Sequence, residues 1–577
     1  MLKFAQTCER IAGTPKKLEK VAIVGEYIKS CPIDQAVVAA VFLSGRPFPV
    51  WEETTLNVGG TLLWRVVEAL SGKAERDLSE AYRRHGDLGA VAAEVLPIIA
   101  GRDLSVAEIQ ARFRQIAAAR GPAAKSALVR ELLSQVTPLE AKYILKIMTG
   151  DLRIGLKESL VEEAIAKAYG GTLPQVQRAN MLLGDIGQTL ELAAAEKLAE
   201  AKMRLFHPLG FMLASPAESA EEALSYFENA FVEDKYDGIR AQAHCAGGEV
   251  KIFSRTRDDI TESFPELPDV LAVIPQDVIL DGEIVAWSYL VGEPNEVGRA
   301  LPFNALQHRL GRKKVSHELM RKVPVAYLVF DVLYAGNDLL LERPLRERAQ
   351  VLDALLAAAR NPVAERSGSA QARLIFDSSE PAQNTRVLRA PVFQASSAPE
   401  LDSLFDAAQA RGNEGLMIKD PESPYTPGRR GKSWLKLKRE LATLDVVVTA
   451  VEYGHGKRIG VLSDYTFAVR DGEKLVNIGK AYSGLTDAEI TQMTKWFLEH
   501  TIEDQGMRLI VEPKIVLEVA FNNMMRSDRH NSGFALRFPR IVRLRPDKPT
   551  EEADAIERVR EIYQQQSGTE ALERTDI

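Results

Sequence analysis

Residues 235–239 read Lys-Tyr-Asp-Gly-Ile and place a lysine amine beside an acidic turn. A Lys-x-Asp-Gly match alone is weak evidence, because a long chain can contain one by chance. Here the match begins an ordered series of short motifs: Ser254-Arg255, Leu280-Asp281-Gly282-Glu283, Phe330-Asp331, Glu414-Gly415-Leu416-Met417-Ile418-Lys419 and Trp434-Leu435-Lys436-Leu437-Lys438. An amine, several carboxylates and paired lysines are the groups needed for an attack on a metal-bound phosphate. Coincidence does not explain such a series.

The order of these motifs resembles the nucleotidyltransferase signature of ATP-dependent DNA ligases, which capping enzymes and RNA ligases share. The resemblance implies that Lys235 attacks the α-phosphate of ATP. The attacking amine must be neutral, whereas a free lysine titrates near pH ~10.4, so the site is expected to lower the pKa of Lys235 by about two to three units. Gly238 is expected to let the backbone and the phosphate come close.

Carboxylates are expected to hold Mg²⁺, with Mn²⁺ as an alternative, because a cation must neutralise the triphosphate charge. Asp281 and Glu283 share one face of a predicted strand at period two, and Glu414 opens another strand after a turn. The resemblance makes Glu283 a contact to the ribose or the metal, and it makes Glu414 a metal ligand.

Basic and aromatic residues complete the predicted nucleotide site. Lys436 and Lys438 alternate with leucines, so a strand would place both amines on one face, with an anion between them. The resemblance assigns both lysines to the α-phosphate. It assigns further contacts as follows: Arg240 and Arg255 to the ribose and the phosphate of the nicked strand, Phe330 to stacking on the purine, and Glu233 to the adenine amino group.

Two segments outside this series also resemble parts of DNA ligases. Residues 532–540 and 545–548 resemble the last ligase motif, which is carried by a mobile OB domain and orients the pyrophosphate; the matching residues are Arg540 and Lys548. Residues 149–155 resemble the helical DNA-binding domain of replicative-type ligases, which makes Arg153, like Arg255, a DNA contact. No sliding-clamp peptide is recognised, and association with a sliding clamp stays open.

The elements that must position these residues change in type along the chain. Residues 1 to about 205 are predicted to be helical: 105–108 and 137–140 are capping boxes followed by apolar residues at helical spacing, and Gly121-Pro122 separates two helices. From about 230 to 440 short β-rich runs alternate with turns and occasional helices, and after 439 such runs become denser.

The predicted fold class is therefore multidomain α+β. An all-α DNA-binding domain (1–205) precedes an α+β adenylation domain of antiparallel sheets (206–440) and a C-terminal OB-fold β-barrel (441–577). The polar tail after Glu551 is predicted to form a solvent-facing helix, and residues 360–385 are predicted to be an insertion or mobile loop.

Composition sets wider limits. The 577 residues are too many for one core, and the three cysteines are too far apart to suggest a zinc knuckle or a disulfide framework. Neither a membrane-spanning apolar run nor a signal peptide is recognised, so the protein is expected in the cytoplasm, at the nucleoid in a prokaryote. The net charge of −7 does not exclude a polyanionic substrate, because basic residues cluster at 308–314, 429–432 and 537–548.

Together these features predict an ATP-dependent DNA ligase that works as a monomer on nicked duplex DNA. It would seal 5′-phosphate/3′-hydroxyl nicks through a lysyl-AMP and an adenylated DNA 5′ end. The nearest alternative is an RNA ligase or capping enzyme with the same catalytic core. A second alternative is a DNA-binding protein with an inactive transferase core, although the lysine, carboxylates and paired lysines are all intact. Replication, repair and end joining are not distinguished.

Overall fold

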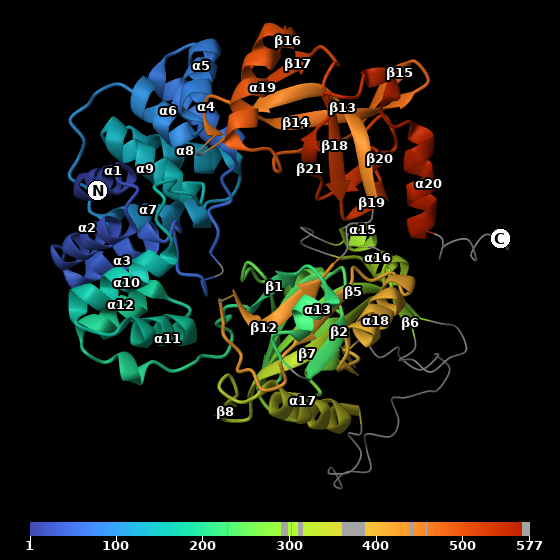
Figure 1. Ribbon diagram of the computed structural model, residues 1–577. Coiled ribbons are helices and arrows are strands. Elements are labelled where there is room, and N and C mark those ends of the chain that lie inside the picture. The colour runs from blue at the N-terminus through green and yellow to red at the C-terminus, as the bar shows by residue number, and fades with distance from the viewer. Residues whose placement is uncertain are drawn as a thin grey trace. The chain divides into compact units, whose positions relative to one another are not determined.

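The computed structural model describes residues 1–52, 54–227, 229–289, 298–301, 303–307, 309, 315–360, 387–428, 430–438, 442–455 and 458–567. The chain divides into two compact units, residues 1–203 with 440–565 and residues 204–439 with 566–577 (Figure 1). The predicted loop at 360–385 lies almost entirely outside the described residues, as does most of the basic cluster at 308–314.

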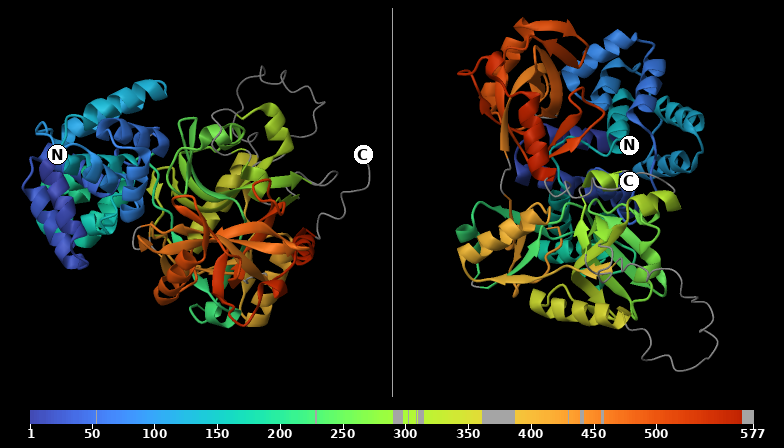
Figure 2. Two further views of the ribbon diagram at one scale, coloured as in Figure 1. Left: turned by 90° about the horizontal axis from the view of Figure 1, so that it is seen from above. Right: turned by 90° about the vertical axis from the view of Figure 1, so that its right-hand side faces the viewer.

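The N-terminal part of the first unit is helical, as the sequence predicts (Figures 1 and 2). Both predicted capping boxes are present, Ser105 with Glu108 and Thr137 with Glu140, and Gly121 directly precedes the helix that starts at Pro122. The helices are α1 (Leu2–Ala12), α2 (Lys17–Lys29), α3 (Ile33–Leu43), α4 (Gly60–Ser71), α5 (Glu75–His85), α6 (Leu88–Val95), α7 (Val106–Ala118), α8 (Pro122–Leu133), α9 (Pro138–Met148), α10 (Glu158–Tyr169), α11 (Leu173–Leu183) and α12 (Ile186–Ala194).

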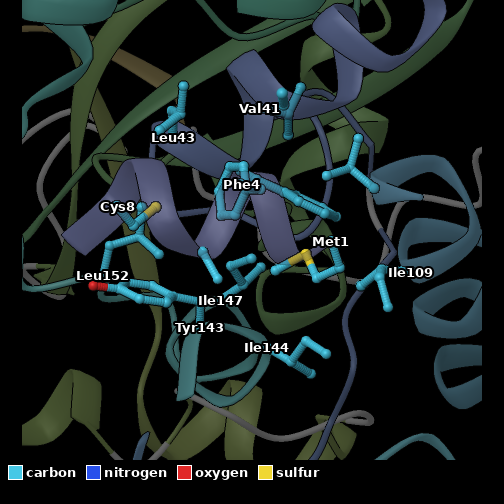
Figure 3. Packing of buried hydrophobic residues seen from close by; sticks show 14 of the residues in the cluster. Met1, Phe4, Cys8, Val41, Leu43, Ile109, Tyr143, Ile144, Ile147 and Leu152 are labelled. Atoms are coloured by element: carbon cyan, nitrogen blue, oxygen red, sulfur yellow. The ribbon is translucent and has the colours of Figure 1, made fainter. Parts of the chain in front are cut away.

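These helices enclose one apolar core. Figure 3 shows Phe4 and Cys8 of α1 lying near Tyr143 and Ile147 of α9. The ring of Phe4 packs edge-on against that of Phe42, with 6.0 Å between centroids. The sequence predicts no disulfide framework, and all three cysteines are free in the structure. Of the helices that the structure describes, none combines the length and the apolar character that a membrane span needs.

The second unit contains two sheets. The first sheet has the order β1 (Leu213–Ala217), β12 (Arg430–Leu437), β11 (Leu416–Lys419), β2 (Ala230–Asp234) and β10 (Phe393–Ala395). The second has the order β4 (Glu249–Ser254), β3 (Ile239–Ala246), β5 (Val278–Tyr289), β7 (Val325–Ala335) and β8 (Asp338–Leu339), with β6 (Gly298–Ala300) beside β5 and β9 (Val387–Arg389) beside β7.

Helices cover one face of each of these sheets. Side chains of α13 (Ala220–Leu224) and α18 (Ala398–Ala410) share a core with the first sheet. Side chains of α14 (Leu267–Leu271) and α17 (Leu345–Arg360) share a core with the second. The remaining short helices of this unit are α15 (Phe303–Gln307) and α16 (His317–Lys322).

The prediction that these sheets are antiparallel is correct for most strand pairs and wrong for two. β1 pairs in parallel with β12, and β9 pairs in parallel with β7. A parallel pair needs a long connection, whereas an antiparallel pair can be joined by a short hairpin. Both exceptions join strands that are far apart in the chain, so the local turn signals carried no information about their direction.

The C-terminal part of the first unit is a sheet domain, as predicted (Figure 1). The long strand β13 (Ala442–Tyr453) pairs with β14 along one edge and with both β17 and β18 along the other. The other elements are β14 (Leu462–Asp471), β15 (Lys474–Ala481), α19 (Asp487–Glu499), β16 (Thr501–Asp504), β17 (Arg508–Val511), β18 (Val516–Phe521), β19 (Asn523–Arg526), β20 (Phe534–Arg537) and β21 (Arg540–Leu544).

The structure corrects one surface prediction and one interpretation of a basic cluster. The C-terminal helix α20 (Ile556–Ser567) was expected to face solvent, yet Ile556, Val559 and Ile562 are buried in the core of the C-terminal sheet domain. Their spacing of three forms an apolar stripe within a polar composition. Arg309 belongs to a basic cluster taken as support for a polyanionic substrate, but it is fully buried and donates to both carboxylate oxygens of Glu266 at 2.7 and 2.8 Å.

Candidate active site

The first sheet has one apolar face and one polar face. Val232, Ile418, Leu435 and Leu437 pack into the core beneath the sheet. Because side chains alternate along a strand, the opposite face carries Glu233, Lys235, Met417, Lys419, Trp434, Lys436 and Lys438. The predicted separation of lysines from leucines in β12 is thereby confirmed.

Lys235 and Glu414 lie side by side where β2 and β11 meet. The backbone N–H of Lys235 donates to the carbonyl of Gly415 at 2.8 Å, and that of Glu414 donates to the carbonyl of Lys235 at 2.9 Å. The side-chain ammonium of Lys235 donates to Oε2 of Glu414 at 2.6 Å, and the ammonium of Lys438 pairs with the same oxygen. Burial alone would raise the pKa of Glu414, but these two cations lower it to about 2.

A buried carboxylate fixes the turn that leads to Glu414. Asp234 accepts two hydrogen bonds from Arg411 and one from Asn413, each at 2.8 Å. Gly415 follows with φ of 142°, and a Cβ there would lie 2.3 Å from the carbonyl oxygen of Leu437. A side chain at position 415 would therefore push β12 away from β11.

The second sheet contributes Arg240, Asp281 and Glu283. Arg240 lies opposite Glu283 in the β3–β5 register and donates to the carboxylate oxygens of Asp281 at 3.1 and 2.7 Å. The hydroxyl of Tyr425 also donates to Asp281, at 2.6 Å. The guanidinium of Arg240 is therefore fixed, with its carbon 5.4 Å from the ring centroid of Phe330.

Glu283 of the second sheet is influenced by the charge of Lys235. Burial raises the pKa of Glu283 to about 7, although the charges of Lys235 and Arg240 act to lower it. The approach of a phosphate to Gly238 stays a prediction, and the structure gives this glycine a packing role as well. A Cβ at position 238 would lie 2.4 Å from the carbonyl oxygen of Ile284, so the glycine permits the close approach of β5.

Glu233 and Phe330 meet a residue to which the sequence assigned no role. Lys419 is 1% exposed, and its Nζ donates to Oε2 of Glu233 at 2.5 Å. The same Nζ lies 4.2 Å from the ring centroid of Phe330 and 4.3 Å from that of Trp434. Lys419 is the last residue of the 414–419 motif. Its spacing of two residues from Met417 predicts that both side chains lie on one face of the strand, and this spacing could have identified it.

Five cationic side chains influence one another at the polar face of the first sheet: Lys235, Arg255, Arg430, Lys436 and Lys438. Burial lowers the pKa of Lys436, and the charges of Arg430, Lys235 and Arg255 lower it further. Burial also lowers the pKa of Lys438, as does Lys235. Arg255 was predicted for the site and Arg430 was not, although it stands in the basic cluster at 429–432. An anion placed among these groups would relieve their mutual repulsion.

The remaining predicted residues belong to the first unit. Lys548 donates to Asp445 at 2.6 Å, and Arg540 is the exposed first residue of β21. Arg153 adopts a left-handed backbone with φ of 51° and donates to Asp151 at 3.0 Å and to the carbonyl of Gly86 at 2.5 Å. The structure therefore does not place these three residues in the same unit as Lys235.

The carboxylates near Lys235 can be judged as metal ligands by their number and kind. Within the described part of the chain, no three His, Cys, Asp or Glu side chains form a group that could hold a metal ion. Mg²⁺ commonly takes one or two carboxylates and completes its shell with phosphate oxygens and water. Glu283 and Glu414 fit such an ion only together with a bound nucleotide.

Comparisons with known proteins cover most of the chain. Family models match as the DNA ligase N terminus over residues 1–201, the ATP dependent DNA ligase domain over 211–438 and the ATP dependent DNA ligase C terminal region over 458–548. A probable DNA ligase of Koribacter versatilis is 60% identical over 98% of this chain and 97% of its own length. A DNA ligase of Methanopyrus kandleri is 34% identical over 97% of this chain and 98% of its own length. A solved structure named Pmar-Lig_PreS3 shares the fold, with a TM-score of 0.60 and 16% identity over 94% of this chain and 99% of that one.

Proposed function

The chain belongs to the ATP-dependent DNA ligase family, and from this premise we propose which of its residues carry each step of nick sealing. The reaction joins a 5′-phosphate to a 3′-hydroxyl at a nick in duplex DNA and consumes ATP. It proceeds through a lysyl-AMP and an adenylated DNA 5′ end. Membership of this family favours a DNA ligase over the alternative of an RNA ligase or capping enzyme.

Lys235 is the proposed nucleophile. After losing a proton, its Nζ attacks the α-phosphorus of ATP; a nitrogen–phosphorus bond forms and pyrophosphate leaves. The observation that supports this role is the pairing of Lys235 with Glu414 at 2.6 Å beside the half-buried Lys436 and Lys438. An incoming triphosphate offers Lys438 a new anionic partner, which would release Glu414 from one of its two cations.

The later steps use the same centre. The DNA 5′-phosphate oxygen attacks the phosphorus of the adduct, and the phosphorus–nitrogen bond breaks to regenerate Lys235. The 3′-hydroxyl then attacks the 5′-phosphorus, and AMP leaves as the phosphodiester forms. Lys436 and Lys438 are proposed to bind the α-phosphate, and the exposed Arg255 is proposed to bind the phosphate of the nicked strand.

Other side chains are proposed to orient the nucleoside. Glu233 accepts a hydrogen bond from the adenine amino group, and Phe330 stacks on the base. Arg240, fixed by Asp281, contacts the ribose together with Glu283. Rigid placement of this kind favours the attack, because the reacting atoms are held in register.

Mg²⁺, or Mn²⁺ in its place, would be held by Glu283 and Glu414 together with phosphate oxygens. When bound, it supplies the positive charge that neutralises the triphosphate and stabilises the leaving pyrophosphate. Before it binds, Glu414 is neutralised by Lys235 and Lys438.

We assign the three segments of the chain as follows. Residues 1–205 form the DNA-binding domain with Arg153 as a contact, residues 206–440 form the adenylation domain, and residues 441–577 form the OB-fold domain. Arg540 and Lys548 of the OB-fold domain orient the pyrophosphate during lysine adenylation. The enzyme is proposed to act as a cytoplasmic monomer.

Incubation with α-labelled ATP and Mg²⁺, followed by a denaturing gel and a chase with nicked DNA, tests this assignment. The wild-type chain should give a labelled, acid-labile band that disappears as the nick is sealed. Lys235→Ala should give no band, whereas Lys474→Ala, at an exposed lysine of β15, should behave as wild type. A normal adduct in Lys235→Ala would remove Lys235 from the nucleophile role.

A pre-adenylated nick separates the first step from the last. Arg540→Ala should lose adduct formation from ATP and still seal the pre-adenylated nick, because pyrophosphate is absent from the later steps. Equal loss of both reactions would contradict the role proposed for Arg540.

A further inference from the structure

We propose that Lys419 is a positioning residue that sets the preference of the site for adenine by holding one carboxylate oxygen of Glu233 and presenting the other to the 6-amino group of the base. The inference rests on the proposed function, because it takes Glu233 as the base contact. It adds a specificity role for a lysine that does not touch the reacting phosphate.

The strand register places Lys419 at the centre of this arrangement. β11 lies between β2 and β12, so its side chains have neighbours on both sides. Met417 is directly opposite Glu233, and Lys419 is two residues further along the same face. On the other side, Lys419 is directly opposite Trp434. Three neighbouring strands therefore bring the carboxylate, the ammonium and the indole together.

Both charges of the pair are removed from solvent. Glu233 is 4% exposed and Lys419 is 1% exposed, with 2.5 Å between Oε2 and Nζ. The rings of Phe330 and Trp434 lie 4.2 and 4.3 Å from Nζ, close enough for cation–π attraction. The ammonium is thus held from three sides, and only Oε2 of the carboxylate is occupied by it.

The buried pair of Glu233 and Lys419 could have a structural role alone or a role in recognition of the base. Its location distinguishes these two roles. It does not lie in the apolar core beneath the first sheet, which contains Val232 and Ile418. It lies on the opposite face, where Glu233 precedes the nucleophile Lys235 at period two. Phe330, the proposed stacking residue, contacts Lys419 directly. A buried carboxylate fixed beside the base-stacking ring is placed for recognition.

The chemistry of the carboxylate explains how Lys419 would act on specificity. An ionised carboxylate only accepts hydrogen bonds, whereas a protonated carboxyl group can donate one. Adenine presents an amino donor at position 6, and hypoxanthine presents an oxygen acceptor there. Lys419 holds Oε2 of Glu233 and thereby orients the accepting carboxylate toward the base. Without the ammonium, the carboxylate loses the partner that orients it, so the geometry that favours an amino donor over a 6-oxo acceptor is lost.

The test compares ATP with inosine triphosphate in the full-length chain by the rate of lysyl-nucleotide adduct formation. In Lys419→Met the ratio of kcat/KM for ATP over inosine triphosphate should fall about 10- to 100-fold, the worth of one hydrogen bond to a charged group. The change should come from a higher KM for ATP, with kcat near the wild-type value. Lys419→Arg should restore part of the ratio, because it returns a cation to Glu233.

A matched control separates this effect from the general loss of a buried lysine. Lys125 is 7% exposed, and its Nζ donates to the carbonyl of Leu56 at 2.5 Å in the first unit. Lys125→Met should leave the ratio unchanged. If Lys419→Met lowers kcat/KM for both nucleotides by the same factor, the role is structural and the proposal is overturned.

The double variant Glu233→Gln/Lys419→Met covers the case in which Lys419→Met fails to fold, because it removes both buried charges together. If Lys419 acts through Glu233, this variant should show the same nucleotide ratio as Glu233→Gln alone. An additional loss of preference in the double variant would overturn the proposal. Absence of any adduct in the wild-type chain would instead remove the proposed function itself.

Discussion

The ammonium of Lys235 and the carboxylate of Glu414 meet at 2.6 Å, although 179 residues separate them in the chain. The backbone N–H of Glu414 also donates to the carbonyl of Lys235, and that of Lys235 donates to the carbonyl of Gly415, so the contact is an extension of the β2–β11 ladder. Lys438 approaches the same carboxylate oxygen from β12. One carboxylate therefore contacts both Lys235, the proposed nucleophile, and Lys438, a proposed phosphate-binding lysine.

The first prediction concerns this carboxylate. Glu414→Gln should slow lysyl-AMP formation on the order of 10²-fold, because a preorganised charge is lost, and should weaken the dependence on Mg²⁺. Single-turnover adduct formation across a Mg²⁺ titration measures both effects. Glu422→Gln is the control, since Glu422 lies in the turn after β11 and pairs only with exposed Arg346 among the described contacts. Unchanged magnesium dependence in Glu414→Gln would remove Glu414 from the metal site.

The second prediction concerns the pH dependence of stability. Burial raises the pKa of Glu283 from its ordinary 4.5 to about 7. Below pH 4.5 the carboxyl group is protonated in both folded and unfolded chains and has no effect. As pH rises from there to about 7, the unfolded chain ionises more readily, and the folded state loses up to about 3 kcal/mol relative to Glu283→Gln.

Urea unfolding at pH 5 and pH 8 in metal-free buffer measures this effect. Glu283→Gln should be more stable than the wild type by about 3 kcal/mol at pH 8 and by only about 1 kcal/mol at pH 5. Mg²⁺ with a nucleotide should reduce the difference at pH 8, because a bound cation favours the ionised carboxylate. A difference that does not change with pH would mean that Glu283 titrates normally in the folded chain.

The third prediction concerns the turn before Glu414. Asp234→Asn should lower the free energy of unfolding by about 2 kcal/mol, since a buried carboxylate loses its bonds to a partly exposed arginine and an amide. Adduct formation should slow as well, because Glu414 is no longer fixed. Asp353→Asn is the control: its pair with Arg389 is 60% exposed on the Asp353 side and should contribute little. Unfolding curves and single-turnover rates of adduct formation measure the two effects. Wild-type values of both in Asp234→Asn would mean that the turn does not depend on Asp234.

The fourth prediction concerns the loop of Arg153. The backbone on both sides of Arg153 is anchored, because the carbonyls of Leu152 and Ile154 accept hydrogen bonds from the buried lysines Lys146 and Lys20, at 3.2 and 2.5 Å. Arg153→Ala should weaken binding of nicked DNA and reduce the slope of log affinity against log salt by about 0.9, the value of one phosphate contact. Fluorescence anisotropy at several salt concentrations measures the slope.

The rate of lysyl-AMP formation is the control for the DNA-binding role proposed for Arg153. Arg153→Ala should form lysyl-AMP at the wild-type rate, because the loop and Lys235 belong to different units. Arg10→Ala, in an exposed pair with Glu26, should leave both the slope and the rate unchanged. An unaltered salt slope in Arg153→Ala would show that this arginine does not contact a phosphate.

The sequence by itself determined the features that depend on near neighbours. Capping residues and apolar spacing located α7 and α9, since a helix start needs local partners for its free N–H groups. Strand alternation placed Lys436 and Lys438 opposite to Leu435 and Leu437, because successive side chains must point to opposite faces. The motif order indicated the family, and the matched family models confirm it.

Only the tertiary structure decided which distant side chains meet. Lys419 reaches Glu233 across 186 residues, and Arg309 is buried against Glu266 instead of facing solvent. Periodicity can place Lys419 on a strand face, but it does not identify the partner in either pair, because the partner depends on which elements become neighbours. The direction of β1 beside β12 has the same origin. A short motif can specify a lysine as reactive, but its partner is chosen by long-range strand pairing, whose register a local segment does not contain.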